Sequence, residues 1–191
     1  MADLMASNVA AAKPYGGGIY WAPKATALPT DASTALAGTY LPLGYISSDG
    51  IQPEHSAQAS NITAWGGDVV AALDGENNRA FSYTLIEVYS KNVNEFIFGA
   101  SQVTETAAVT GTSNSKLAIT DKAEPVQDGV LVFDMKHNGT RRRIVVPAPK
   151  SVISGEGPYQ DTGLTSYSVT STAIKDDSGV RVYDYIERDD K

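Results

Sequence analysis

The sequence predicts a mainly β fold in which two antiparallel sheets pack as a β-sandwich or barrel beside one flanking short α-helix. Ser, Thr, Gly, Ala and Val are abundant in the 191 residues, which favours strands joined by many turns. Short apolar or alternating runs recur along the chain, separated by Asp-Gly, Asn-Gly and Gly-Gly dipeptides. One segment has the period of a helix. Many short strands and a single helix therefore favour a sandwich.

Residues 1–40 differ from the rest because they show no sustained period of either strand or helix. We expect an extended N-terminal arm here and a single β-sandwich domain over residues 41–191. Tyr15, Tyr20 and Trp21 are large apolar side chains on this segment. They either pin the arm onto its own domain or dock on a neighbouring subunit, and the sequence leaves both open.

The stretch from Leu41 to Asp68 opens as a short apolar strand and turns at Asp49-Gly50, a dipeptide that favours tight turns. It then stays extended but polar for about a dozen residues, which cannot bury themselves within a small domain. We expect a projecting loop or hairpin over about residues 47–61 that reaches for another chain. Ile62 and Trp65 are expected to return this segment to the core, with an interface position as the alternative for Trp65.

Residues 90–99 form the one predicted helix. Val93, Phe96 and Ile97 fall at positions i, i+3 and i+4 and make one apolar stripe. Ser90 or Asn92 can cap its start, and Gly99 can end it in the left-handed conformation. So short a helix must lie against a sheet.

The remaining elements are predicted strands. Before the helix they cover residues 69–73, closed by Asp74-Gly75, and residues 79–88. After it they cover residues 103–109, 117–120, 129–136, 140–147, 151–154, 164–174 and 180–186. Turn signals at residues 137–139 and 176–179 predict two hairpins.

Composition argues against several classes of function. The formal net charge is −7 and the isoelectric point is about 4.7, which disfavours a sequence-independent grip on nucleic-acid phosphates. There is no cysteine, so disulfides and thiolate metal sites are excluded. The N-terminus lacks the pattern of a signal peptide, and no apolar run approaches the roughly 18 residues of a membrane helix.

Residues that could carry catalysis or hold a metal are few. His55 and His137 are the two histidines, and neither lies near a nucleophile-elbow pattern, so we expect both to be solvated. Asp121, Glu124 and Asp128 lack the regular spacing of a calcium loop. We therefore expect no catalytic residues, no cofactor and no metal, and a protein that is not an enzyme.

Arg141, Arg142 and Arg143 form the one basic cluster. Side chains alternate along a strand, so Arg142 should point away from its two neighbours. We expect these residues to pair with acidic groups, within the chain or across subunits, rather than with nucleic acid.

Several short motifs occur in one order along most of the chain. They are Ala22-Pro23, Leu28-Pro29-Thr30-Asp31, LGYISSDGI at residues 43–51, ITAWGGD at residues 62–68 and RRIVVP at residues 142–147. This order resembles the major tail proteins (tail tube proteins) of long noncontractile-tailed phages, especially those that infect actinobacteria. Ser48 departs from the pattern, which more often has an acidic residue there.

The resemblance implies a fold of two antiparallel sheets with a flanking helix, shared with the tube component of type VI secretion. It implies a structural virion protein whose hexameric rings stack into a tail tube with an acidic lumen, through which DNA passes without specific binding. Implied partners are further copies of the chain, the tape measure protein and tail terminator or tail tip proteins, with no membrane. The residues we expect at subunit contacts are Tyr15, Tyr20, Trp21, Ser48, Asp49, Gly50, Ile51, Glu54, His55, Arg141 and Arg143.

Two other functions remain as alternatives. A β-sandwich that decorates a capsid or binds host-surface glycan would need an aromatic platform, for which Tyr159, Tyr167, Tyr183 and Tyr185 are candidates. A hydrolase is the weakest hypothesis, since the sequence offers no base beside a nucleophile.

Overall fold

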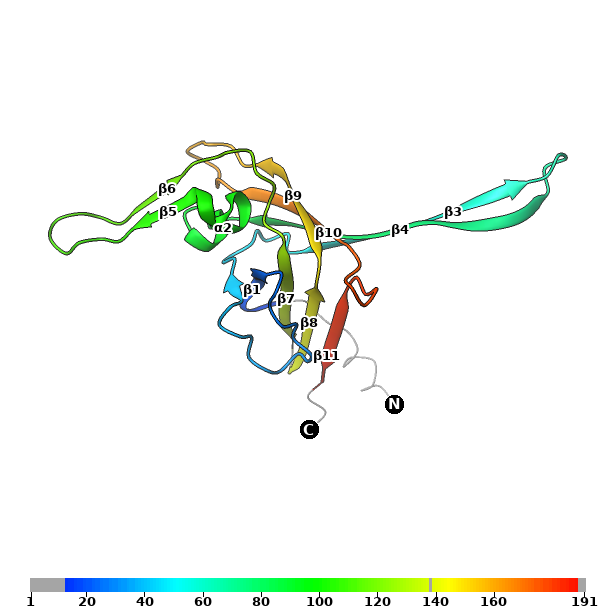
Figure 1. Cartoon of the computed structure of the whole chain (residues 1–191), viewed down its shortest axis with the longest axis horizontal. Helices are drawn as coiled ribbons and strands as arrows, with labels where there is room; N and C mark the ends of the chain where they lie inside the picture. Colours follow the sequence, from blue (N-terminus) through cyan, green and yellow to red (C-terminus); the bar gives the residue numbers. More distant parts are fainter. Residues whose placement is uncertain (1–12, 138, 189–191) are drawn as a thin grey trace.

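The structure, a computed structural model, describes residues 13–137 and 139–188. Two antiparallel sheets pack face to face to form the body, and two ribbons extend from it in opposite directions (Figure 1). The predicted fold class, mainly β with two packed sheets and one flanking helix, is confirmed.

The first sheet has five strands in the order β11-β8-β7-β1-β2. Their bounds are Tyr183–Glu187 (β11), Thr140–Val146 (β8), Gly129–His137 (β7), Lys13–Pro23 (β1) and Leu41–Pro42 (β2). The second sheet has four strands in the order β3-β4-β10-β9. Their bounds are Gln52–Thr63 (β3), Val69–Leu85 (β4), Tyr167–Ala173 (β10) and Pro149–Glu156 (β9).

The core lies between the two sheets. Phe81 on β4 packs on Phe133 of β7 with ring centroids 4.9 Å apart, and Tyr83 meets the same ring edge-on at 5.9 Å. Alternation along β10 buries Tyr167, Val169, Ser171 and Ala173 on the inner face. The period-2 pattern of β10 is thus the pattern by which the second sheet buries one face.

Helix α2 (Lys91–Phe98) covers one end of this core. Val93, Phe96 and Ile97 are buried, as the apolar stripe predicts, and Phe96 packs against Trp21 at 6.1 Å between centroids. Ser90 occupies the N-cap position without a side-chain hydrogen bond. Gly99 has φ 96° and ends the helix as predicted, and the short 3-10 helix η1 (Ala100–Gln102) follows.

Strand β1 corrects the expected N-terminal arm for its own residues. It lies inside the first sheet between β7 and β2, with Trp21 opposite Leu131. Ile19 and Ala22 are fully buried. The sequence of this strand shows no clear period, because it contains glycines and prolines and its pairing with β7 has a bulge between Pro14 and Ile19.

Residues 24–40 cover the outer face of the first sheet as a loop. Tyr40 is buried against Val130, Val132 and Val145, and its hydroxyl donates to the carbonyl of Ala27 at 2.9 Å. The molecule therefore has a second, smaller apolar cluster outside the sandwich.

Two later predictions are corrected. The turn at residues 176–179 forms, with Gly179 at φ 78°, but it links β10 of the second sheet to β11 of the first and makes no hairpin. Strands β5 (Val103–Thr106) and β6 (Lys116–Ile119) pair only with each other within the described chain, as a separate ribbon. The hairpin predicted at residues 137–139 is present as β7–β8.

Candidate functional site

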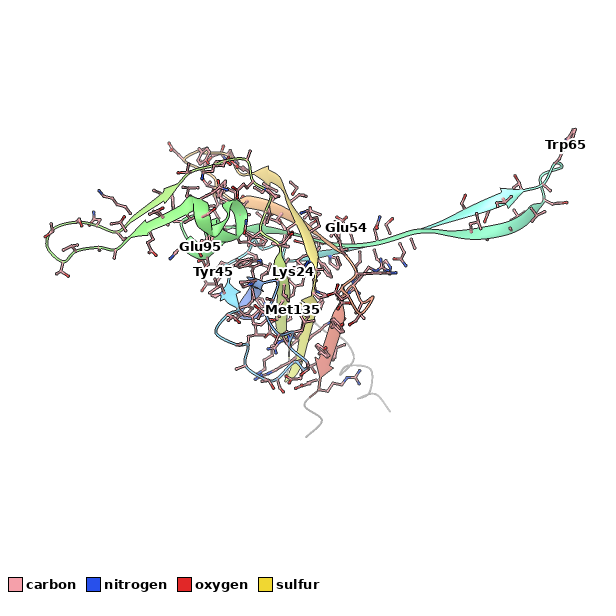
Figure 2. All side chains as sticks on the ribbon, viewed as in Figure 1. Lys24, Tyr45, Glu54, Trp65, Glu95 and Met135 are labelled. Atoms are coloured by element: carbon pink, nitrogen blue, oxygen red, sulfur yellow. The ribbon has the colours of Figure 1, made fainter. Side chains whose placement is uncertain are left out.

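The most unusual feature of the molecule is the outer part of the β3–β4 hairpin. Residues 80–85 of β4 pair with β10, and residues 80–82 also pair with β3, whereas residues 69–79 pair only with β3 within the described chain. We call the two-stranded part, residues 55–79, the projecting ribbon. It leaves the body near Glu54 and ends at Trp65, far from every other labelled residue (Figure 2).

The ribbon carries apolar side chains that none of the described residues covers. Trp65 is fully exposed at the tip with a relative accessibility of 108%, and Val70 is 62% exposed. Ile62, Val69 and Leu73 are also exposed. Ile62 and Leu73 share one face, because Ile62 lies opposite Ala71, Leu73 lies opposite Ser60, and side chains alternate along a strand. An isolated two-stranded hairpin is at best marginally stable in water, so burial of these side chains against a partner would stabilise the ribbon.

The tip is a tight turn. The amide of Ala64 donates to the carbonyl of Asp68 at 2.8 Å, and the amide of Gly67 donates to Ala64 at 3.0 Å. Gly66 and Gly67 have φ of 123° and 94°, values that residues with a Cβ rarely adopt. The two glycines therefore let the chain reverse while the indole of Trp65 stands clear of it.

The expected projection is correct in kind and wrong in its bounds. We expected residues 47–61 to project and Ile62 and Trp65 to return to the core, but these two residues are at the far end of the ribbon. The expected break at Asp74-Gly75 is also wrong, because β4 runs unbroken from Val69 to Leu85. The dipeptide lies instead at an irregularity of the ladder, where the register shifts between Asn77 and Asp74.

The root of the hairpin begins with the predicted turn at Asp49-Gly50. The amide of Gly50 donates to Ser47 at 3.0 Å, and Gly50 has φ 69°. Ser48 and Asp49 are exposed, whereas Ile51 packs partly against the core.

Glu54 and His55 come next and are both exposed on β3. The ring nitrogen Nε2 of His55 lies 3.0 Å from Oδ1 of Asn77 across the ribbon. Arg181 donates from its guanidinium to the carbonyl of Asn77, which braces the root of the ribbon against the body.

The outer face of the second sheet is lined by hydroxyl groups. Ser82 and Thr170 are 3.1 Å apart through their side-chain oxygens, and Thr84 and Ser168 are 3.2 Å apart. Ser82 also donates to Glu54 at 3.4 Å. The inner face of the same strands is apolar, so the sheet presents a neutral, hydrogen-bonding surface outward.

Two of the residues predicted at subunit contacts are buried inside the protein. Trp21 is 8% exposed in the main core. Arg143 is 3% exposed, donates to Asp134 at 2.7 Å and also donates to the carbonyls of Asp31 and Thr34. Both predictions are wrong, because β1 and β8 place these side chains on inward or covered faces.

The other predicted contact residues are placed as follows. Tyr20 is half-buried in the second apolar cluster, and Arg141 donates to the carbonyl of Ser33 at 3.1 Å. The side chain of Tyr15 lies outside the described part of the structure.

The prediction that Arg142 points away from its two neighbours on β8 is confirmed. Arg142 is exposed and makes a two-pronged contact with Asp184 on β11, at 3.0 and 2.6 Å. This hydrogen bond raises the pKa of Arg142. Arg142 and Arg143 thus pair with acidic groups of the chain itself, as expected.

The candidate catalytic and metal-binding residues do not converge. Within the described residues, no group of three or more His, Asp or Glu side chains could hold a metal ion. Asp121 accepts from the amide of Ala123, and Asp128 pairs with Lys150 at 3.4 Å. None of the described helices has the length and apolar character needed to cross a membrane.

The four tyrosines considered as a glycan platform do not form one surface. Tyr167 is buried in the second sheet, whereas Tyr183 and Tyr185 stack on each other on β11 of the first sheet. Tyr159 is exposed in the loop between β9 and β10.

Comparison with known proteins gives a weak structural likeness. No family model matches the sequence, and no curated protein matches it. The structure is similar to that of the anti-feeding prophage cap (AFP tube terminating cap), determined by cryo-EM, with a TM-score of 0.42 and 10% sequence identity. The alignment covers 98% of this chain and 99% of that chain. A TM-score below 0.5 does not establish a common fold.

Proposed function

We propose that this chain is a structural virion protein that polymerises into stacked rings, hexameric by resemblance, to form the tube of a phage tail. The observation that carries the proposal is the projecting ribbon. It exposes five large apolar side chains on a hairpin that the body of the same molecule does not cover, namely Ile62, Trp65, Val69, Val70 and Leu73. Apolar surface of this kind on a soluble protein marks a protein contact.

The second support is the motif order in the sequence, which resembles that of tail tube proteins. The segments that carry it include the root and the tip of the ribbon, LGYISSDGI at residues 43–51 and ITAWGGD at residues 62–68. The resemblance and the unusual geometry thus coincide on the same hairpin.

The hydroxyl-lined face of the second sheet is the surface we assign to the channel. Ser82, Thr84, Ser168 and Thr170 satisfy one another by hydrogen bonds, and Glu54 adds a negative charge beside them. Such a face has little attraction for phosphates, and the net charge of −7 repels them. It therefore suits a conduit through which DNA slides.

The partners in this proposal are further copies of the chain along the tube. A tape measure protein inside it, and tail terminator or tail tip proteins at its ends, follow from the resemblance. The protein would reside in the virion after synthesis in the host cytoplasm.

Negative-stain electron microscopy of the concentrated protein tests the proposal. We expect rings or tubes for the natural chain and monomers for Leu73→Asp, because a charge on the apolar face of the ribbon opposes its burial. Thr110→Asp, on the opposite ribbon, is the matched exposed control and should still assemble. Monodisperse monomers of the natural chain at high concentration, also with a tail terminator protein added, would contradict the proposal.

A further inference from the structure

The groove between residues 86–90 and the loop between β9 and β10 is the second unusual surface. It has a volume of about 800 Å³, and Tyr89 and Leu164 contribute to its lining. Tyr89 is 93% exposed and Leu164 is 71% exposed, so large apolar side chains stand open at its edge. Tyr45, which accepts a backbone hydrogen bond from Ile86, is exposed beside it.

The groove and the tip of the projecting ribbon lie at opposite ends of one strand. Leu85, the last residue of β4, pairs with Tyr167, so the groove begins where β4 ends. Trp65 lies just before the other end of β4. A strand of 17 residues spans about 55 Å at the usual rise per residue, so Trp65 cannot reach the groove of its own chain.

We infer that the tip of the projecting ribbon, with Trp65 as its anchor, docks into this groove on a second copy of the chain. The inference rests on the proposed function and identifies the two surfaces that meet in the assembly. Both surfaces carry large apolar side chains that are exposed in the single chain, and the two surfaces differ from each other. Contact between two different surfaces of identical chains is heterologous, which produces closed rings or open helical filaments rather than simple dimers.

The chemistry of the groove suits an indole. A buried Trp normally needs an acceptor for its ring N–H, and the residues that line the groove include Glu87, Ser90 and Gln160, whose side chains carry acceptor oxygens. The turn that carries Trp65 is narrow, and a Cβ built at Gly66 or Gly67 would meet no other atom within 4 Å. The tip is therefore slim enough to enter a groove. Anchors of this kind, an aromatic side chain in a pocket, dominate the energetics of many interfaces.

Mixing two single variants tests the inference. Trp65→Ala removes the anchor, and Leu164→Asp places a charge in the groove; both residues are exposed, so we expect each variant to fold as a monomer. We expect either variant to raise the concentration required for assembly by about tenfold or more, the effect of losing a hot-spot residue. An equimolar mixture should form heterodimers, because one intact tip meets one intact groove. Ile174→Asp, exposed but outside both surfaces, should assemble normally.

Crosslinking provides a second measurement, since the natural chain has no cysteine. Ala64→Cys mixed with Thr165→Cys should give a dimer with a short bis-maleimide, whereas Ala64→Cys mixed with Ile186→Cys should not. Tubes that form without the 64–165 crosslink, or that tolerate both Trp65→Ala and Leu164→Asp, would overturn the inference and leave the proposed function intact. Failure of the natural chain to assemble at all would overturn both.

Discussion

Strand β4 joins two regions of opposite character without a break in its backbone. Residues 80–85 pair with β10, residues 80–82 also pair with β3, and Phe81, Tyr83 and Leu85 are buried in the core. Residues 69–79 have β3 as their one strand partner, and Val69, Val70 and Leu73 are exposed. Apolar residues of one strand therefore serve two ends: those in the body stabilise the fold, and those on the ribbon are available for association.

Amide exchange should show the largest difference between the two halves. In the free chain we expect amides of residues 80–85 to open only with global unfolding, which for typical domains costs about 5 to 15 kcal/mol. Amides of residues 69–79 should exchange through local opening at a far smaller cost. Exchange measured by mass spectrometry on peptides from each half checks this. Of these two halves of β4, assembly should raise protection only in residues 69–79. Equal protection of the ribbon in monomer and assembly would contradict it.

Truncating one apolar side chain in each half should separate stability from assembly. Phe81→Ala should lower the free energy of unfolding by about 4 kcal/mol, because it leaves a cavity against Phe133. Leu73→Ala should change it by less than about 0.5 kcal/mol, as exposed substitutions usually do. Urea denaturation of the monomer measures both. A large loss of stability in Leu73→Ala would show that the ribbon belongs to the folding unit.

The neighbouring arginines offer the same comparison on strand β8. Arg143→Met should cost about 3 kcal/mol, because it leaves the buried carboxylate of Asp134 without its cation and frees the loop at residues 31–34. Arg142→Met should cost less than about 1 kcal/mol, since its pair with Asp184 is exposed. The midpoints of thermal or urea denaturation would distinguish the two, and equal costs would contradict the assigned burial.

The smallest expected effect is on how the stability of the fold decreases at acid pH. Hydrogen bonds from Val180, Tyr183 and Ser178 hold the pKa of Asp176 below its usual value of 3.8. A carboxyl with a lowered folded pKa stabilises the fold above its unfolded pKa, and that contribution is lost as the pH falls through the folded value. Asp176→Asn should therefore flatten the fall in the urea midpoint below about pH 4. Asp177→Asn, which removes a neighbouring carboxylate of the same turn, is the control variant.

Much of the fold could be predicted because burial in a sandwich leaves a direct record in sequence. The alternation of Phe81, Tyr83 and Leu85, the stripe of Val93, Phe96 and Ile97, and the glycine that ends α2 each reflect a local rule. Sequence periodicity did not predict a strand whose pairing partners lie far from it along the chain. Strand β1 has no clear period, yet β7 and β2 hold it in the first sheet.

The candidate site could be predicted only in outline. The polar run after Asp49-Gly50 indicated a projection, but Trp65 was expected in the core because large aromatic side chains are usually buried. No local sequence pattern predicts that β4 extends beyond its pairing with β10, because the extent of this pairing depends on the length of β10. The groove at the other end of β4 was not predicted, because its two sides are about 75 residues apart in sequence.

The sequence alone determined the class of the fold, the helix at residues 91–98, the turn at Asp49-Gly50 and the existence of a segment too polar to be self-contained. These follow from periods and turn preferences that act over a few residues. Only the tertiary structure decided that Trp21 and Arg143 are internal, that Trp65 lies at the tip of a ribbon, and that an open groove with exposed Tyr89 and Leu164 lies at the far end of the same strand. The reason is that burial depends on which strands end beside which, and strand order brings together segments that share no local pattern.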